Sequence, residues 1–431
     1  MIFLTARERI ERYPSERRMY ANYVVKNIKK ICKEAGPRPS GSERELKAQQ
    51  MMAEDLRTSC DEVNIEEFKL APGAFMGWVQ LLVFCGVAGT VLLFLSHWNW
   101  IPNQPLIFPA VATGLFVIGI FFVIFEFLFY KQALDVFFPK KTSHNVVAVR
   151  KPAGEVKRRI IFSGHADSAP EWWFTYLGGP KLLTSVIGLG LGGCVYAAVM
   201  SVITFVLSAT GNDISNNKII FILSAVALCF TPVYIFCLFF YNPKRPVEGA
   251  NDNLTGCLCS MAVPRFLQDH GIQLENTEVM VVLTGSEEAG LRGAKAFVKA
   301  HAKEFAAEKD VETVFFGLDT VRDFDYMGVY SKDMTGTVKN SPEVSKLVKE
   351  GAAVAGYDLP YKSVFFGSSD AAAITQGGMK ATCFAAMDPA PARYYHTRLD
   401  TADNLDLKTV EAGVDICLET LFLFDEKGLD V

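Results

Sequence analysis

The sequence has little net charge and no paired cysteine motif. Its 43 Lys and Arg residues against 47 Asp and Glu residues leave a net charge of −4 over 431 residues, which gives no support to nucleic-acid binding. The ten cysteines form no Cys-x-x-Cys pair, so we expect buried free thiols in a reducing compartment rather than a disulfide framework. The first nine residues lack the apolar core of a signal peptide, and we expect none.

Charge is also missing from four long apolar stretches, in a chain that is 50% hydrophobic. Each stretch is long enough to cross a bilayer, and the second carries only Glu126 near its end. The stretches are residues 74–96, 106–130, 183–209 and 219–241. Short linkers at 97–105 and 211–218 join them in pairs, and Pro232 predicts a kink in the last. We therefore predict two transmembrane hairpins with four helices. Buried core helices are the alternative, which suits charge-free runs of this length less well.

Lysine and arginine residues indicate on which side of the membrane the rest of the chain lies. They flank the predicted hairpins on the side of the soluble part, whereas the linker 97–105 has none and the linker 211–218 has only Lys218. By the positive-inside rule, we expect an integral protein of the cell membrane with its soluble part in the cytoplasm. The flanking residues are Lys131, Lys140, Lys141, Lys181, Lys244 and Arg245.

Outside the hairpins, apolar runs alternate with helical patterns, which predicts an α/β sheet flanked by helices. Ser42 and Glu45 have the spacing of a capping box at the start of one helix. The predicted strands are 63–68, 144–149, 159–163, 279–283, 313–318 and 381–386. The predicted helices are 14–35, 43–59, 254–268, 289–301, 341–356 and 407–424. We divide the chain into a soluble domain made of 1–73, 131–182 and 242–431, with hairpins at 74–130 and 183–241.

Two adjacent glutamates, Glu287 and Glu288, follow the apolar run 279–283 in a turn that begins at Gly285. The carboxyl end of a strand is where ligands bind in α/β sheets. Neighbouring side chains in such a turn point in different directions, so one carboxylate would hold a metal while the other faces a reacting water. A solvated acidic turn is the alternative interpretation of an isolated pair.

Five further segments place a histidine or an acid at a predicted strand end or in a loop. His165 and Asp167 follow the strand 159–163 on the same side of the chain, so the carboxylate would orient the imidazole. The other candidates are Asp252, Asp319, Asp370 and His396. Singly, each has a structural explanation, such as a helix cap or a hydrogen-bonded loop residue. Together, two imidazoles and three carboxylates suit a pair of divalent ions, most naturally zinc.

In the order of these segments, the chain resembles the di-zinc aminopeptidases related to glutamate carboxypeptidase and the glutaminyl cyclases. The resemblance spans the whole soluble part and implies a three-layer α/β/α, zinc-exopeptidase-like domain with a mixed sheet. The chain departs from the family pattern in two places. It contains the hairpins, which soluble relatives lack, and it has Ala371 after Asp370, where the family often has a histidine. The second departure argues against a pocket role for that loop. The matching segments are Gly36-Pro37-Arg38-Pro39-Ser40-Gly41-Ser42, His165-x-Asp167, Gly249-Ala250-x-Asp252-Asn253, Glu287-Glu288-x-Gly290-Leu291, Leu318-Asp319 and His396-Thr397-x-x-Asp400-Thr401.

The resemblance implies a role for each of these side chains. Glu287 would be the general base, and Asp167 would orient the histidine beside it. Two metal ions at such a site activate a shared water. The implied ligands of two zinc ions are Asp252 between both, His165 and Asp319 at one, and Glu288 and His396 at the other.

We therefore expect a membrane-embedded, zinc-dependent exopeptidase of aminopeptidase type, acting on a peptide or an acylated amino acid. The alternatives are an amidase or carboxypeptidase acting on N-acyl amino acids or lipidated peptides, and a non-enzymatic receptor or transporter with a peptidase-like domain. A glutaminyl cyclase fits less well, because such cyclases resemble one-zinc versions of the site, whereas both His165 and Asp319 are present here. The sequence leaves the oligomeric state open.

The second hairpin lies between the segment of His165 and Asp252, so we expect the active-site face to look toward the bilayer. Four aromatic residues follow Asp167 closely. They would lie at the headgroup level or line the substrate pocket, and the sequence does not separate these two interpretations. The four residues are Trp172, Trp173, Phe174 and Tyr176.

Overall fold

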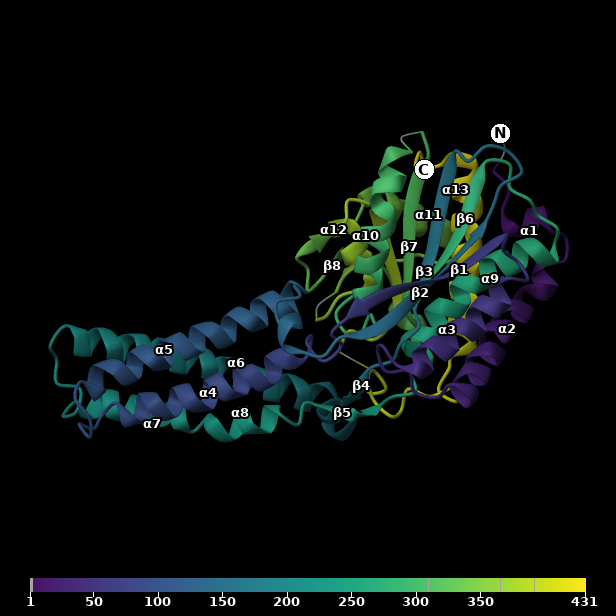
Figure 1. The fold of residues 1–431 in the computed structure, drawn as a ribbon. Coiled ribbons are helices and arrows are strands. Elements are labelled where there is room, and N and C mark those ends of the chain that lie inside the picture. The colour runs from purple at the N-terminus through teal and green to yellow at the C-terminus, as the bar shows by residue number, and fades with distance from the viewer. Residues whose placement is uncertain (1–2, 309, 365, 391) are drawn as a thin grey trace. The chain divides into compact units, whose positions relative to one another are not determined.

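The chain forms two units and crosses between them four times. The computed structural model describes residues 3–308, 310–364, 366–390 and 392–431. Unit 1 comprises Met1–Pro72, Lys140–Glu171 and Pro243–Val431, and unit 2 comprises Gly73–Pro139 and Trp172–Asn242 (Figure 1). Residues 131–139 and 172–182 thus lie in unit 2, whereas the sequence patterns assign them to the soluble part. The reason is local, because helix α6 already begins at Trp173 and the carboxylate of Glu126 holds the loop after α5.

Unit 1 is built on a nine-stranded mixed sheet in the order β1-β2-β6-β3-β7-β11-β8-β10, with β9 paired to β8. Strand β3 is parallel to both β6 and β7, and β11 is parallel to β7. The pairs β1–β2, β2–β6 and β8–β11 are antiparallel. The strands are β1 (Glu62–Leu70), β2 (Lys141–Arg150), β3 (Arg158–His165), β6 (Thr277–Thr284), β7 (Glu312–Val321), β8 (Met327–Asp333), β9 (Val338–Lys339), β10 (Tyr361–Ser363) and β11 (Lys380–Ala386). Two further strands, β4 (Pro170–Trp172) and β5 (Tyr241–Pro246), pair with each other.

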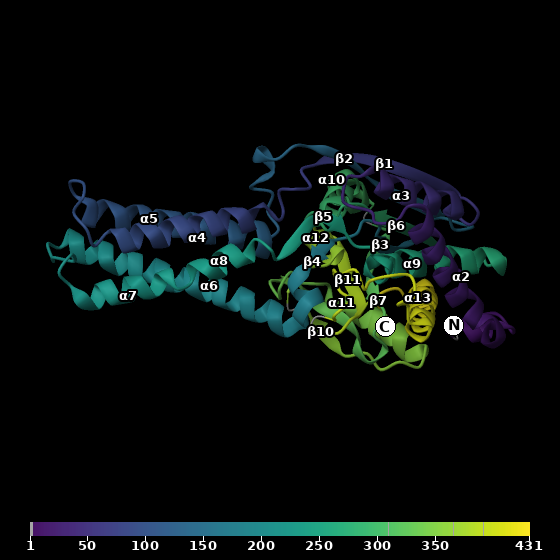
Figure 2. The ribbon, with the colours of Figure 1, turned by 90° about the horizontal axis from the view of Figure 1, so that it is seen from below.

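Helices cover both faces of this sheet (Figures 1 and 2). Helices α9, α11 and α13 contact one face, and α10 and α12 contact the other. Strands β3 and β6 are buried on both sides, which explains the unbroken apolar run Val279–Leu283 of β6. This is the three-layer α/β/α arrangement that the resemblance implies. The helices of unit 1 are α1 (Ala6–Arg9), α2 (Tyr13–Glu34), α3 (Glu43–Leu56), α9 (Thr255–Asp269), α10 (Arg292–Ala307), α11 (Pro342–Val354), α12 (Asp370–Gln376) and α13 (Leu407–Lys427).

The structure differs from the sequence patterns mainly at short elements. Strands β8, β9 and β10 were not expected, because they lie toward the sheet edge and lack a long apolar run. Helix α10 begins at Arg292 instead of at residue 289. The turn before it is closed by the backbone N–H groups of Gly290 and Leu291, which both donate to the Glu287 carbonyl. All ten cysteines are free thiols, but Cys229 is exposed rather than buried as predicted.

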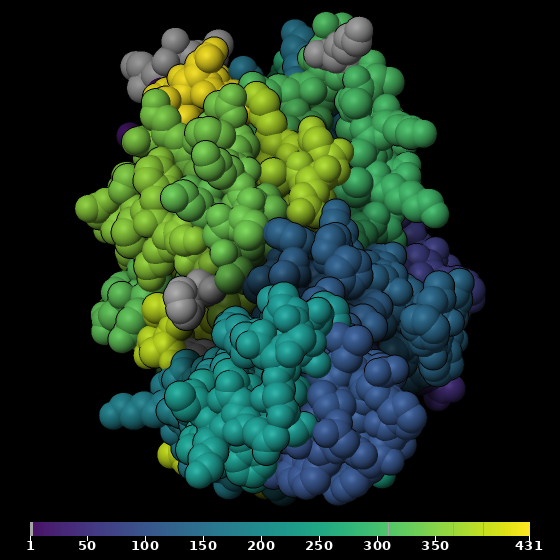
Figure 3. Space-filling model, turned by 90° about the vertical axis from the view of Figure 1, so that its left-hand side faces the viewer, coloured from purple at the N-terminus to yellow at the C-terminus, as the bar shows by residue number. Residues whose placement is uncertain are grey.

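Unit 2 contains four helical segments that are long and apolar enough to cross a membrane. Figure 3 looks onto the end of this unit, where the first hairpin (blue) and the second (teal) lie side by side. The segments are Gly77–Leu95, Gln104–Leu128, Trp173–Ala209 and Lys218–Cys237. They comprise α4 (Gly77–Leu95), α5 (Gln104–Phe122) with a wider turn at Val123–Leu128, α6 (Trp173–Ala209), α7 (Lys218–Leu228) and α8 (Thr231–Cys237).

The last apolar segment is broken rather than merely kinked. Pro232 lies in the first turn of α8, and the helix is interrupted between Leu228 and Thr231. The segment ends at Cys237 instead of at residue 241, because Tyr241 begins β5.

Side chains inside unit 2 pack through small residues and aromatic rings. A Cβ on Gly89 would lie 2.8 Å from the ring of Phe116, so only glycine permits this approach of α4 to α5. Trp172 packs against Phe240 at 4.9 Å between ring centroids, and Phe174 packs against Phe236 at 4.8 Å. These two of the four aromatic residues after Asp167 are therefore held by the second hairpin itself.

Candidate metal centre

The candidate residues converge at the carboxyl ends of the parallel strands. His165 is the last residue of β3, Asp319 lies near the end of β7, and Glu287 follows β6. Because β3 is parallel to β6 and to β7, these three ends meet at one edge of the sheet. Asp252 enters from the turn Ala250–Leu254, and His396 enters from the loop after β11.

Asp252 presents one carboxylate oxygen to each of two histidines. Its Oδ1 lies 3.1 Å from His165 Nε2, and its Oδ2 lies 3.0 Å from His396 Nε2. His396 Nε2 is also 3.1 Å from Glu288 Oε1. The metal-binding atoms of His165, Asp252 and Glu288 all lie within 4.8 Å of one another. The structure thus brings four of the five predicted ligands into direct contact.

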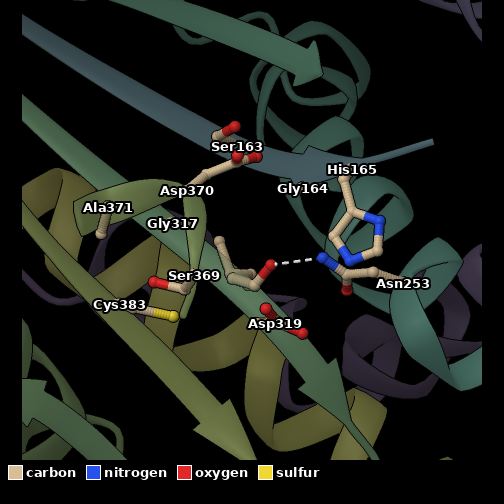
Figure 4. Close-up of a pocket in the computed structure, with 11 residues that line it drawn as sticks. Ser163, Gly164, His165, Asn253, Gly317, Asp319, Ser369, Asp370, Ala371 and Cys383 are labelled. Carbon is tan, nitrogen blue, oxygen red and sulfur yellow. Dashed lines mark hydrogen bonds between the residues drawn. The ribbon is translucent and has the colours of Figure 1, made fainter. Parts of the chain in front are cut away.

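A small cavity beside His165 contains the fifth predicted ligand, Asp319. Figure 4 shows the His165 ring and the Asp319 carboxylate with the Asn253 amide between them in this view, and this amide donates to the Leu318 carbonyl at 2.8 Å. Asp370 lines the same cavity. Although it is the first residue of α12, its carboxylate accepts a hydrogen bond from the Thr284 hydroxyl instead of capping the helix. The loop of Asp370 therefore does reach the site.

Asp167 holds both an imidazole and the backbone of the glutamate turn. Its Oδ1 lies 3.3 Å from His165 Nδ1 and accepts the backbone N–H of Glu287 at 3.0 Å. Its Oδ2 accepts the backbone N–H of Glu288 at 3.1 Å and the hydroxyl of Ser40 at 2.7 Å. Asp167 thus lies beside the imidazole that it was predicted to orient, although His165 Nδ1 forms no hydrogen bond with a described residue. The contacts to the turn have no signal in the sequence.

Two further acids fix the backbone around the site, and sequence patterns missed both. Glu45 accepts the backbone N–H of Ser286 at 2.6 Å and that of Gly41 at 2.7 Å. Its spacing from Ser42 suggested only a capping box, and Ser42 does accept its backbone N–H, but the carboxylate reaches the glutamate turn. Asp400 accepts the backbone N–H of Asp252 at 3.1 Å, which aims the central carboxylate. In the sequence, only the position of Asp400 four residues after His396 indicated that it lies near the site.

Arg38 is a fully buried cation that joins three loops. Its guanidinium donates to the carbonyls of Ala166 at 2.7 Å, Glu248 at 2.7 Å and Gly249 at 2.8 Å. Ala166 follows His165, and Gly249 lies three residues before Asp252. The arginine thereby fixes the spacing between two of the candidate ligand segments.

The centre is rich in acids and short of positive charge. Burial and then the neighbouring Asp252 raise the pKa of Asp319 to about 7. Burial raises the pKa of Glu287 well above its ordinary range, and Glu288 adds to this rise. Burial disfavours the charged imidazole of His396, but Glu288 and Asp252 outweigh it and raise its pKa to about 10.

The same residues fit divalent cations. Asp252 Oδ2 and Glu288 Oε1 are buried and accept no hydrogen bond from any residue that the structure describes. Imidazole nitrogens and carboxylate oxygens that face one another in this way form a donor set suited to zinc. An ion between them would supply the positive charge that the crowded carboxylates lack.

Tyr395 is a further aromatic side chain at the centre that the sequence patterns did not single out. Its ring stacks on His396 with the centroids 3.9 Å apart. Burial and then the carboxylates of Asp252 and Glu288 raise the pKa of its phenol, which therefore stays protonated.

Comparison with known proteins agrees with this fold. Residues 238–421 match Peptidase family M28, and this segment contains Asp252, Glu287, Glu288, Asp319 and His396. No curated protein matches the chain by sequence.

Solved structures with a similar fold include two aminopeptidases and a glutaminyl cyclase. BSAP, a zinc aminopeptidase from Bacillus subtilis, is 14% identical, with 93% of this chain and 94% of that chain covered and a TM-score of 0.54. The aminopeptidase from Aneurinibacillus sp. strain AM-1 is 16% identical, with 93% of both chains covered and a TM-score of 0.53. The glutaminyl cyclase from Fimbriiglobus ruber is 14% identical, with 94% of this chain and 95% of that chain covered and a TM-score of 0.53. At these identities the likeness is one of fold, and residues 238–421 are similar to Peptidase family M28.

Proposed function

We propose that the chain is a membrane-embedded, zinc-dependent exopeptidase of aminopeptidase type. The observation that carries this proposal is Asp252, which presents one oxygen to His165 and the other to His396. The family match supports peptide hydrolysis. The zinc in the name of the Bacillus subtilis enzyme, which shares the fold, supports the choice of metal.

In the proposed mechanism, five side chains would hold two zinc ions, and a sixth handles the proton. The five are His165, Asp252, Glu288, Asp319 and His396. Bound zinc would supply a polarised water and positive charge beside the scissile carbonyl. Glu287, which is not among the ligands, accepts a proton from the attacking water and returns it to the leaving amine.

The excess of acid favours a substrate with a free amino terminus. Six carboxylates surround the centre, so even two divalent ions leave negative charge uncompensated. Such surroundings stabilise an α-ammonium group and disfavour the carboxylate that a carboxypeptidase would bind. The six acids are Asp167, Asp252, Glu287, Glu288, Asp319 and Asp370.

Membrane embedding is supported by the outward face of unit 2. Large apolar side chains such as Phe84 and Val117 are 64% and 61% exposed. A stacked pair, Trp98 and Trp100, lies beyond one end of α4, and Trp78 lies in its first turn at the other end. Aromatic residues at both ends of an apolar helix are typical of a membrane span. A helix of 19 residues is about 28 Å long, which matches the hydrocarbon core.

Metal content and a substrate panel test the proposed activity together. Purified protein should contain about two zinc ions per chain and should hydrolyse peptides with a free amino terminus faster than N-acylated ones. Cleavage of acylated substrates alone would overturn the aminopeptidase assignment in favour of an amidase acting on N-acyl amino acids or lipidated peptides. Protein that binds no metal and cleaves neither class would instead support the receptor or transporter alternative.

The proposed location of unit 1 in the cytoplasm has its own test. Lys131, Lys140 and Lys141 follow the first hairpin, whereas the linker at 97–105 carries no cation. A fluorescent protein fused after Val431 should fluoresce, and alkaline phosphatase fused there should stay inactive. The reverse pattern would overturn this location.

A further inference from the structure

Residues 131–139 form a loop of unit 2 that exposes two large apolar side chains. Val136 is 81% exposed and Phe137 is 75% exposed. No other large apolar side chain that the structure describes is more exposed than these two. They lie outside the four apolar segments, in the short turn Asp135–Phe137. Their exposure is therefore not explained by the helices themselves.

The loop is held in place from within unit 2. The carboxylate of Glu126 accepts the backbone N–H groups of Ala133 at 2.9 Å and Leu134 at 3.1 Å. The side chain of Leu134 is buried. The ring of Phe138 lies over the start of α4, where a Cβ on Gly77 would be 2.6 Å from it. Residues on both sides of Val136 and Phe137 are thus fixed, and these two side chains point away from the bundle.

Three lysines lie close to the exposed pair in the sequence. Lys131 precedes it in the loop, Lys140 and Lys141 follow it as the first residues of unit 1 after the loop, and all three are exposed. Asp135 is the one acid between Lys131 and Lys141. Residues 131–141 therefore combine two exposed apolar side chains with a net positive charge, which is the composition of a segment that binds an anionic lipid surface.

The position of the loop along the chain places it at one end of the apolar helices. It begins three residues after Leu128, where the second apolar segment ends. Aromatic rings cluster at this end. The ring centroids of Trp78 and Phe127 are 5.1 Å apart, and those of Phe75 and Tyr130 are 4.9 Å apart. Such a cluster at the end of a span is typical of the headgroup level of a bilayer.

We propose that this loop is a lipid-binding element that inserts Val136 and Phe137 into the headgroup region of an anionic bilayer. Lys131, Lys140 and Lys141 then contact the lipid phosphates. The inference rests on the proposed membrane embedding of unit 2 and adds a lipid preference to it. Because the loop is rigidly joined to α4 and α5, its insertion also fixes how deep the first hairpin lies.

Tryptophan quenching by brominated lipids tests the proposal in the full-length protein. The variant Phe137→Trp is reconstituted in nanodiscs of brominated phosphatidylcholine, with and without phosphatidylglycerol, and the signal of the five native tryptophans is subtracted with the unchanged protein. We expect the added tryptophan to be quenched, and more strongly with phosphatidylglycerol. A second variant, Phe84→Trp, reports on the outward face of α4 and should be quenched in both lipids.

The two variants separate the possible failures. Quenching at position 84 without quenching at position 137 would overturn the lipid-binding loop and leave the membrane helices in place. The absence of quenching at both positions would overturn membrane embedding itself, and the loop proposal with it.

A charge-reversed variant tests the role of the lysines. The triple variant is Lys131→Glu, Lys140→Glu, Lys141→Glu. The ratio of phosphatidylglycerol to phosphatidylcholine among the lipids that the protein retains should fall by about fivefold for each lysine that contacts a phosphate. The matched control reverses Lys29, Lys33 and Lys47, which are exposed lysines of α2 and α3, and should leave the lipid preference unchanged. An equal lipid preference in the loop variant and the unchanged protein would contradict the proposed phosphate contacts.

Discussion

Asp167 accepts the backbone N–H of Glu287 at 3.0 Å. The same carboxylate oxygen faces His165 Nδ1 at 3.3 Å, so one side chain sets the imidazole of a proposed ligand and the position of the proposed base. The other oxygen holds the backbone of Glu288. Ligand and base are therefore coupled through a residue that need not touch substrate, and a change at Asp167 should disturb both functions together.

The first prediction concerns Asp167→Asn. An amide offers one acceptor oxygen in place of two, so one of the two backbone N–H groups of the turn loses its partner. Activity or zinc affinity should fall by about 10–100-fold. Steady-state kinetics and zinc content per chain would measure both effects. Ser40→Ala removes only one neutral hydrogen bond from Asp167 and should have a smaller effect. Equal effects of the two variants would contradict the proposed coupling.

The second prediction separates the adjacent glutamates. Glu287→Gln cannot accept a proton and should lower kcat by about 10²–10⁴-fold, while zinc content stays unchanged. Glu288→Gln replaces a proposed ligand of almost the same size and should lose zinc as well as activity. Metal analysis of both purified variants decides the matter. If the Glu287→Gln variant lost its zinc and the Glu288→Gln variant kept it, the proposed roles would be exchanged.

The third prediction concerns Arg38→Lys. A lysine keeps the charge but cannot donate at once to the carbonyls of Ala166, Glu248 and Gly249, so buried acceptors lose their partners. The expected loss of stability is about 2–4 kcal/mol, and zinc affinity should fall because the segments of His165 and Asp252 are no longer held together. Thermal unfolding and zinc titration would measure both.

A matched control for the arginine is available beside α3. Arg57 is half exposed and pairs with Glu54, so Arg57→Lys should change neither stability nor zinc affinity appreciably. An Arg38 variant that behaves like this control would show that the buried guanidinium does not position the centre.

How much of this structure the sequence reveals depends on how local each signal is. Strand β6 and the turn after it were predictable, because an unbroken apolar run ends at Gly285 and two acids follow. The four apolar helices were predictable for the same reason, since each coincides with a long apolar stretch that carries almost no charge. The candidate ligands emerged from strand ends and their order in the chain.

The residues that fix the centre were not predictable, because their partners are distant in sequence. Glu45 reaches Ser286 across 241 positions, and its local pattern suggested a helix cap. Asp400 reaches Asp252 across 148 positions. Strand β8 and the edge strand β10 were missed because they owe their conformation to pairing within the sheet rather than to a pattern of their own.

The fourth prediction is a pH dependence that lies away from the metal centre. Glu419 of α13 is buried and accepts the backbone N–H of Ala6, which ties the N-terminal segment to the domain. Burial raises the pKa of its carboxyl to about 7. Since this is above the unfolded value of about 4.3, the folded state binds the proton more tightly. The associated stability is complete at low pH and is lost as the pH rises through about 7.

Glu419→Gln should remove this loss, because the amide oxygen still accepts the Ala6 N–H but does not ionise. The variant should gain about 3 kcal/mol over the unchanged protein at pH 8 and only a few tenths at about pH 4. Thermal unfolding at both pH values would measure the difference. Glu350→Gln removes one exposed charge from α11 and controls for the change in net charge. Only a carboxyl that titrates makes the effect of the substitution depend on pH. A gain of equal size at both pH values would therefore contradict the prediction and would mean that the substitution acts through packing.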